Sequence, residues 1–152
     1  MRILLLSSFT LLIMAACGTN PVTGKRQVTL MSQAQEISLG RQQYAPSLQS
    51  QGGTYVIDKS LNAYVNNVGQ RLARHSAQPN LPYEFTVLNN DVPNAWALPG
   101  GKIAINRGLL VLLEDEAQLA AVLAHEVVHA AARHGAEQHA SHTGFQLLST
   151  IT

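Results

Sequence analysis

The sequence predicts a mainly helical α+β domain in which a small sheet or hairpin lies beside one very apolar helix. Two segments begin with good N-cap signals and the second of them shows helical spacing, residues 83–106 are rich in strand signals, and an apolar helix follows at about 115–134. The 152 residues suffice for one domain. A hydrophobic content of 46% with a net charge of +1 excludes a disordered chain and a basic surface for nucleic acid.

The first 16 residues are interpreted as a signal peptide. From Ile3 to Cys17 the chain carries no charge, and this run is shorter than the roughly 20 residues of a membrane-spanning helix. It ends in Met14-Ala15-Ala16-Cys17, which resembles a bacterial lipobox, so we expect Cys17, the only cysteine, to be lipidated. Gly18 is not the Asp of an inner-membrane retention signal, which favours the outer membrane, facing the periplasm. The alternative is an ordinary signal peptide with an incidental cysteine.

A tether and a first helix are expected next. Residues 17–31 contain Gly, Asn, Pro and Thr, and are predicted to form the lipidated N-terminus and a tether. Ser32 and Gln35 make a capping-box pattern, so a helix is predicted to begin there and to end before Pro46. Residues 49–54 are predicted to be a loop. We assign residues 32–152 to the N-terminal part of the folded domain.

A second helix is predicted to begin after Asp58 and to reach about His75. Asp is a good N-cap residue, and apolar residues then recur on one helical face. These residues are Leu61, Val65, Val68 and Leu72. Both helices are expected to serve as scaffold.

Three short strands and a third long helix complete the predicted elements. Residues 83–87 alternate with period two, and residues 94–98 and 102–106 flank Pro99-Gly100-Gly101, which fits a type II turn. Acidic residues then precede an apolar helix over about 115–134. The sheet or hairpin is therefore expected to lie beside this helix.

The chemistry is predicted to lie in this apolar helix, which is interrupted only by His125, Glu126 and His129 between Ala117 and Ala132. Ionisable groups on a buried helix are costly unless they are satisfied. The two histidines are four residues apart, so both imidazoles project from one face and can share one zinc ion. Glu126 can then take a proton from a water that the metal activates, as in peptide hydrolysis of the H-E-x-x-H kind.

A third zinc ligand is missing from this pattern. On an ideal helix His134 lies about 140° round from His129, so it cannot join the same ion unless the helix ends between them. Glu137 is the only acid after His129, and no carboxylate follows it. We therefore expect an N-terminal fragment, the alternative being a degenerate, inactive relative. The later histidines are expected to be solvated residues beyond the helix, although they could form a second metal cluster: His134, His139 and His142.

The segments HEVVHAAARH, NAWALPGGKIAINRGLL and NPVTGKRQVTLMSQAQEISLGRQQY resemble the HtpX-like and CAAX prenyl protease-like zinc metalloendopeptidases, in particular their periplasmic lipoprotein members. The resemblance covers most of residues 20–140 and implies a zincin-like fold with one zinc ion per chain. It assigns His125 and His129 as zinc ligands and Glu126 as the catalytic base. It also implies a third ligand from a Glu on a later helix, which this chain lacks.

The same resemblance implies a substrate cleft beside the second strand of the 94–106 segment. An unpaired strand can bind an extended peptide by main-chain hydrogen bonds. This interpretation assigns substrate contacts to Lys102, Ile103 and Ala104, with Asn94 and Trp96 lining the cleft. The alternative is a packed hairpin with Trp96 in the core.

Two functions follow from these interpretations. The first is a zinc-dependent endopeptidase that acts on unfolded or misassembled cell-envelope proteins and is held on the membrane through a lipid on Cys17. The second is a non-catalytic envelope lipoprotein that uses the same fold as a chaperone or assembly scaffold. The sequence does not indicate an oligomeric state.

Overall fold

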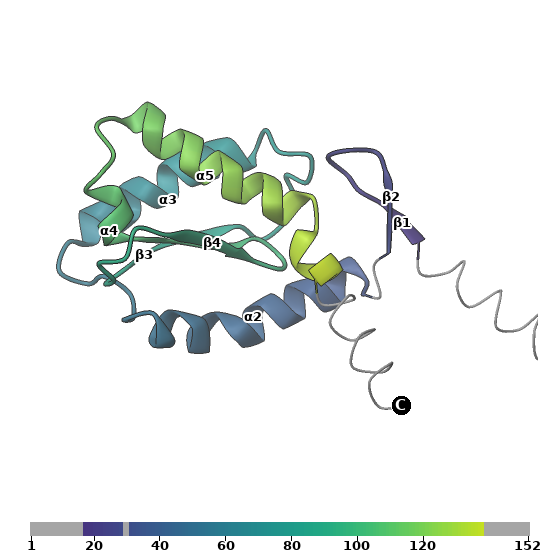
Figure 1. Ribbon diagram of the computed structural model, residues 1–152, viewed down its shortest axis with the longest axis horizontal. Helices are drawn as coiled ribbons and strands as arrows, with labels where there is room; N and C mark the ends of the chain where they lie inside the picture. The colour runs from purple at the N-terminus through teal and green to yellow at the C-terminus, as the bar shows by residue number, and fades with distance from the viewer. Residues whose placement is uncertain (1–16, 29–30, 139–152) are drawn as a thin grey trace, which may run out of the picture.

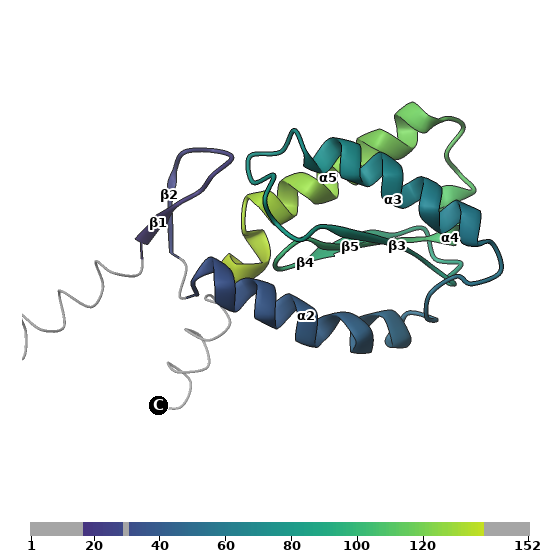
Figure 2. The same cartoon turned by 180° about the vertical axis from the view of Figure 1, so that it is seen from behind.

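A three-stranded sheet lies between helices on both of its faces (Figure 1, Figure 2). The computed structural model describes residues 17–28 and 31–138. Helix α2 (Gln33–Ser50) covers one face of the sheet, whereas α3 (Lys59–Ala73) and α5 (Glu116–Ala131) cover the other. The predicted α+β class is confirmed.

The strand order places β5 in the centre of the sheet. Strands β3 (Glu84–Leu88) and β5 (Lys102–Asn106) are parallel, and β4 (Ala95–Leu98) pairs antiparallel with the other side of β5. The prediction that residues 102–106 form an unpaired strand is therefore wrong. The physical reason is that Ile103, Ala104 and Ile105 are all buried, which requires cover on both faces and suits a central strand. The edge of the sheet beside α5 is β4.

A glycine turn joins β4 to β5, as predicted. Gly100 has φ +76°, as the third position of a type II turn requires, and Gly101 has φ +86°. Helix α2 crosses this turn at Gly40, where an added Cβ would lie 1.8 Å from the Pro99 carbonyl oxygen. The turn is therefore fixed by backbone packing.

Helix α2 begins as predicted but continues past its proline. Ser32 and Gln35 form the capping box, whereas the helix runs through Pro46 to Ser50. Pro46 removes one helical hydrogen bond. Packing of α2 on the sheet offsets this loss, because Tyr44 is buried and its hydroxyl lies 2.6 Å from the Thr86 hydroxyl.

The main core lies between the sheet and the helix pair α3 and α5. The Asp58 carboxylate accepts hydrogen bonds from the first turn of α3, which confirms the predicted cap. Val65 and Val68 of α3 are buried against Phe85, and Leu123 of α5 is fully buried. The predicted second helix is thus confirmed as part of the scaffold.

The remaining elements flank this core. The short α4 (Arg107–Leu110) leads to α5, whose N-cap Asp115 accepts a hydrogen bond from the Gln118 amide. In the segment predicted to be a tether, β1 (Cys17–Thr19) and β2 (Arg26–Val28) form an antiparallel hairpin. The predicted signal peptide lies outside the described residues. Among the helices that the structure describes, none is both long enough and apolar enough to cross a membrane.

Candidate metal and catalytic site

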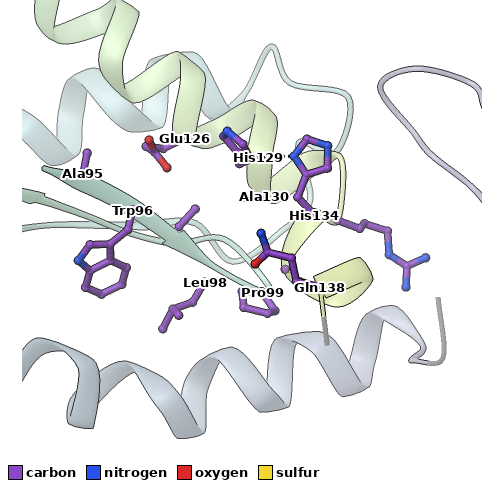
Figure 3. A pocket seen from close by; sticks show the side chains of 12 residues that line it. Ala95, Trp96, Leu98, Pro99, Glu126, His129, Ala130, His134 and Gln138 are labelled. Carbon is purple, nitrogen blue, oxygen red and sulfur yellow. Dashed lines mark hydrogen bonds between the residues drawn. The ribbon is translucent and has the colours of Figure 1, made fainter. Parts of the chain in front are cut away.

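The site is built on α5, which packs one face into the core and turns another towards β4. Leu119, Leu123 and Val127 recur at helical spacing and are buried against the sheet and α3. This packing fixes the rotation of the helix. Glu126 and His129 consequently face the space beside β4 (Figure 3).

The two motif histidines lie together at one site. Their rings are 4.5 Å apart between centroids, and the Nε2 atoms of His125 and His129 are 3.0 Å apart. Two nitrogens bound to one tetrahedral zinc ion at about 2.1 Å are about 3.4 Å from each other, so a small spreading of the rings would admit the ion. Imidazole nitrogens are ordinary zinc ligands, and the pair therefore fits two positions of a zinc site.

The environment of the site favours neutral groups when no metal is bound. Burial raises the pKa of the Glu126 carboxyl, and the nearby charge of His125 partly opposes that shift. Burial also lowers the pKa of His129, and the positive charges of His125 and His134 lower it further. The neutral imidazole is the form that binds a metal, and the lowered pKa of His129 favours that form.

A third protein ligand is not found within residues 17–28 and 31–138. No group of three His, Cys, Asp or Glu side chains in these ranges is arranged to hold a metal ion. The described residues therefore bring together two histidines that fit a zinc site, with one carboxylate beside them.

Two hollows lie along β4, and Glu126 lines both of them. One hollow, of about 270 Å³, lies between residues 95–99 and the α5 face that carries Glu126 and His129. A second hollow lies between Asn94 and the α5 face that carries His125 and Glu126. Glu126 thus lines both hollows, and each of them borders β4.

The residues predicted to bind substrate have separate locations. Asn94 is exposed and lines the second hollow. Trp96 borders the first hollow, but its ring is half-buried and extends towards α2 (Figure 3), where it meets Tyr44 edge-to-face at 6.5 Å. Trp96 therefore borders the hollow and also packs against Tyr44, which combines the two predicted placements, in the cleft and in the core.

The three substrate contacts predicted in β5 assumed an unpaired strand, and β5 is paired. The Lys102 ammonium lies 2.5 Å from the Glu84 carboxylate, and Ile103 and Ala104 are buried. Since β5 is paired on both sides, its backbone has no free edge for a peptide. Among the strands that the structure describes, the edge of the sheet beside α5 is β4.

The chain reverses directly after α5, earlier than predicted. The helix ends at Ala131, three residues before His134, and Arg133 adopts a left-handed conformation with φ +62°. His134 is therefore not a solvated residue beyond the helix but is half-buried, with its Nδ1 atom 2.8 Å from Nδ1 of His129. The expectation that His134 cannot join the ion of His129 is conditional on a helix that continues between them, and α5 ends at Ala131.

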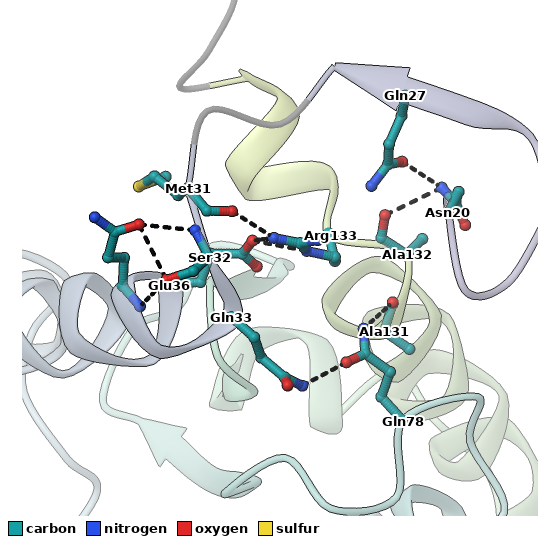
Figure 4. A network of polar contacts seen from close by, with 11 residues as sticks. Asn20, Gln27, Met31, Ser32, Gln33, Glu36, Gln78, Ala131, Ala132 and Arg133 are labelled. Carbon is teal, nitrogen blue, oxygen red and sulfur yellow. Dashed lines mark hydrogen bonds and ion pairs between the residues drawn. The ribbon is translucent and has the colours of Figure 1, made fainter. Parts of the chain in front are cut away.

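A buried ion pair holds this reversal. The guanidinium of Arg133 pairs with the Glu36 carboxylate of α2, with 2.7 Å between Nε and Oε1 (Figure 4). It also donates a 2.7 Å hydrogen bond to the Met31 carbonyl. The Glu36 side chain is only 5% exposed, so the pair is removed from water.

Side-chain amides bind the last carbonyls of the helix. The Gln78 amide donates to the Ala131 carbonyl at 2.6 Å, and the Asn20 amide of the β1–β2 hairpin donates to the Ala132 carbonyl at 3.1 Å (Figure 4). A helix C-terminus leaves such carbonyls without intrahelical partners. Segments distant in sequence therefore fix the end of the helix that bears the site.

The HExxH motif on α5, with its two paired imidazoles beside a carboxylate, provides residue types that zinc metallopeptidases use. The sequence model of Peptidase family M48 matches residues 59–152, and the chain belongs to this family of zinc metalloendopeptidases. The family resemblance predicted from the sequence is thus confirmed. These matches do not test the predicted lipid anchor, which stays a prediction.

Named relatives come from bacteria and mitochondria. The chain is 34% identical over 116 residues to the Beta-barrel assembly-enhancing protease of Escherichia coli (strain K12), covering 76% of this chain and 23% of the relative. It is 44% identical over 75 residues to the Mitochondrial metalloendopeptidase OMA1 of Schizosaccharomyces pombe, and that match covers 49% of this chain and 22% of the relative. It is 39% identical over 71 residues to the Mitochondrial metalloendopeptidase OMA1 of Arabidopsis thaliana, and that match covers 47% of this chain and 15% of the relative. The chain therefore spans less than a quarter of the length of these relatives.

Proposed function

We propose that this protein is a zinc-dependent endopeptidase that hydrolyses unfolded or misassembled proteins of the cell envelope. The observation that carries the proposal is the convergence of the Nε2 atoms of His125 and His129 beside Glu126, over the open edge of β4. Membership of Peptidase family M48 supports the same reaction.

Each site residue has a defined task in this reaction. His125 and His129 would hold the zinc ion, which when bound acidifies a water molecule and polarises the scissile carbonyl. Glu126 removes a proton from the attacking water and later delivers it to the leaving amine nitrogen. The partly buried position of Glu126 raises its pKa, and a carboxyl with a raised pKa is better suited to return a proton than one in free solution.

The shape of the cleft supports an extended polypeptide as the substrate. A strand edge binds a peptide through main-chain hydrogen bonds, which do not depend on the side chains of the peptide. Unfolded proteins present such backbone, whereas folded domains hide it. Hollows border β4 on either side of Glu126, and a bound chain that occupied both would continue past the scissile bond in both directions, as in an endopeptidase.

The proposed location is the periplasmic face of the outer membrane, with the protein anchored by lipid on Cys17. The lipobox resemblance at Met14-Ala15-Ala16-Cys17 supports the anchor. The similarity to a relative named Beta-barrel assembly-enhancing protease supports envelope proteins as the substrate class.

The proposal is tested by Glu126→Gln in the complete gene product, with casein as an unfolded substrate. We expect cleavage to fall at least 10²-fold, the usual lower contribution of a general base, because the amide cannot take a proton. Zinc content by elemental analysis should remain that of the wild type, since both histidines are retained.

A chelator control and the alternative function complete this test. Removal of zinc should abolish cleavage in the wild type, and added zinc should restore it. Equal cleavage by wild type and Glu126→Gln would overturn the proposed mechanism. A wild-type protein that binds no zinc yet prevents aggregation of unfolded proteins would instead support the chaperone or scaffold alternative.

A further inference from the structure

His134 contacts a candidate zinc ligand on the side away from the metal position. Of the two ring nitrogens of His129, Nε2 faces Nε2 of His125 at 3.0 Å, and Nδ1 faces Nδ1 of His134 at 2.8 Å. The rings of His129 and His134 are 4.8 Å apart and nearly perpendicular, with an interplanar angle of 72°. Such a distance is that of a hydrogen bond between ring nitrogens.

The direction of this hydrogen bond follows from the metal site. A neutral imidazole carries one proton, and the nitrogen that binds a metal must be the unprotonated one. With Nε2 of His129 towards the metal, its proton is on Nδ1, which donates. Nδ1 of His134 is then the acceptor, and the proton of His134 lies on Nε2.

We propose that His134 is a positioning residue for the zinc site, accepting a hydrogen bond from Nδ1 of His129. This bond fixes the tautomer and the ring orientation of His129 and increases its basicity as a ligand, as partners of metal-bound histidines do. The inference rests on the proposed function insofar as it requires zinc at His125 and His129, but it does not require catalysis.

His134 does not occupy the place of the third ligand. Its Nδ1 lies against the nitrogen of His129 opposite to the one that faces His125. Within the part of the chain that the structure describes, His134 joins no group of three side chains arranged to hold a metal. Its role is therefore exerted through His129.

The position of His134 is built into the fold. It follows Arg133, whose left-handed backbone conformation reverses the chain and whose guanidinium is paired with the buried Glu36. Left-handed conformations of non-glycine residues cost free energy and persist where the surrounding structure enforces them. Without this reversal, a continuing helix would carry His134 away from His129.

The test compares zinc affinities of the complete gene product carrying His134→Phe or His134→Asn, by competition with a chromogenic chelator. Phe keeps a planar ring without an acceptor, and the Asn side-chain oxygen can occupy the place of Nδ1. We expect zinc affinity to fall about 10- to 100-fold in His134→Phe and to recover most of that loss in His134→Asn. Thermal unfolding of the metal-free proteins shows whether either variant is misfolded.

Two results would overturn the inference. One is a His134→Phe affinity within twofold of the wild type, and the other is an equal loss in both variants with unchanged metal-free unfolding. Nitrogen-15 NMR of the zinc-bound wild type gives an answer that needs no variant. We expect protons on Nδ1 of His129 and on Nε2 of His134; a neutral His134 protonated on Nδ1 would contradict the proposed bond.

These outcomes separate the inference from the proposed function. A wild type that binds zinc but leaves casein intact would overturn the proposed peptidase activity, while the affinity series would still decide the role of His134. Conversely, casein cleavage lost in Glu126→Gln together with unchanged zinc affinity in His134→Phe would overturn only the role of His134.

Discussion

At the scale of single residues, the site depends on charged groups removed from water. Glu36 and Arg133 form such a pair, with side chains 5% and 16% exposed. Arg71 and Glu116 form a contrasting pair, with side chains 57% and 49% exposed. Burial makes an unpaired charge expensive, whereas exposed pairs add little to stability.

The substitution Glu36→Gln is expected to destabilise the protein by about 3–5 kcal/mol, because it leaves the Arg133 guanidinium buried without its counter-charge. The measurement is urea-induced unfolding of wild type and variant. Glu116→Gln is the matched control, since it makes the same chemical change at an exposed pair, and we expect no measurable shift of its unfolding midpoint. Similar shifts in the two variants would contradict a special role for burial.

At the scale of elements, close backbone contact joins the scaffold helix to the hairpin that forms the cleft floor. Helix α2 crosses the β4–β5 turn at Gly40, against the Pro99 carbonyl. Another helical glycine, Gly69 of α3, admits the ring of Phe85 in the same way, since an added Cβ would lie 2.5 Å from it. Both glycines are explained by packing, not by backbone conformation.

Gly40→Ala should therefore destabilise the protein. On an isolated helix this change would be favourable by about 0.5–1 kcal/mol. Here the new methyl group would lie 1.8 Å from the Pro99 carbonyl oxygen, and forcing α2 off the turn should cost about 1–3 kcal/mol. Thermal unfolding checks the sign, with Ser38→Ala on the exposed face of α2 as the control. A Gly40→Ala protein that melts above the wild type would rule out the contact.

At the scale of the whole molecule, the N-terminal hairpin connects the proposed anchor to the site. Cys17 begins β1, and three residues later the Asn20 amide is bonded to the Ala132 carbonyl at the end of α5. If Cys17 is acylated, the membrane surface is therefore close to the catalytic helix and not separated from it by a long flexible tether.

Replacement Cys17→Ser tests the anchor in cells. Each buried acyl methylene contributes about 0.8 kcal/mol to membrane binding, so loss of the acyl chains should move the protein from the membrane fraction to the soluble fraction. Fractionation followed by immunoblotting measures this, and Ser38→Ala, on the exposed face of α2, serves as the control. A Cys17→Ser protein that sediments with membranes as firmly as the wild type would disprove lipidation.

The sequence by itself predicted the α+β class, the long helices, the strands of the three-stranded sheet and the family. Caps at Ser32 and Asp58, the apolar periodicity of the second helix and the acidic residues before the third predict the helices, because these signals act within a few residues of each other. The spacing of His125 and His129 predicts a shared metal for the same reason, since a helix brings residues four apart to one face.

Only the tertiary structure decided how distant segments meet. The central place of β5, the pairing of Arg133 with Glu36 and the return of His134 to His129 all join residues through the fold and not through local spacing. Local propensity cannot predict that α5 ends at Ala131, because carbonyl acceptors there are satisfied by Asn20 and Gln78 from elsewhere in the chain. Contacts of this kind depend on packing, and packing is a property of the assembled layers.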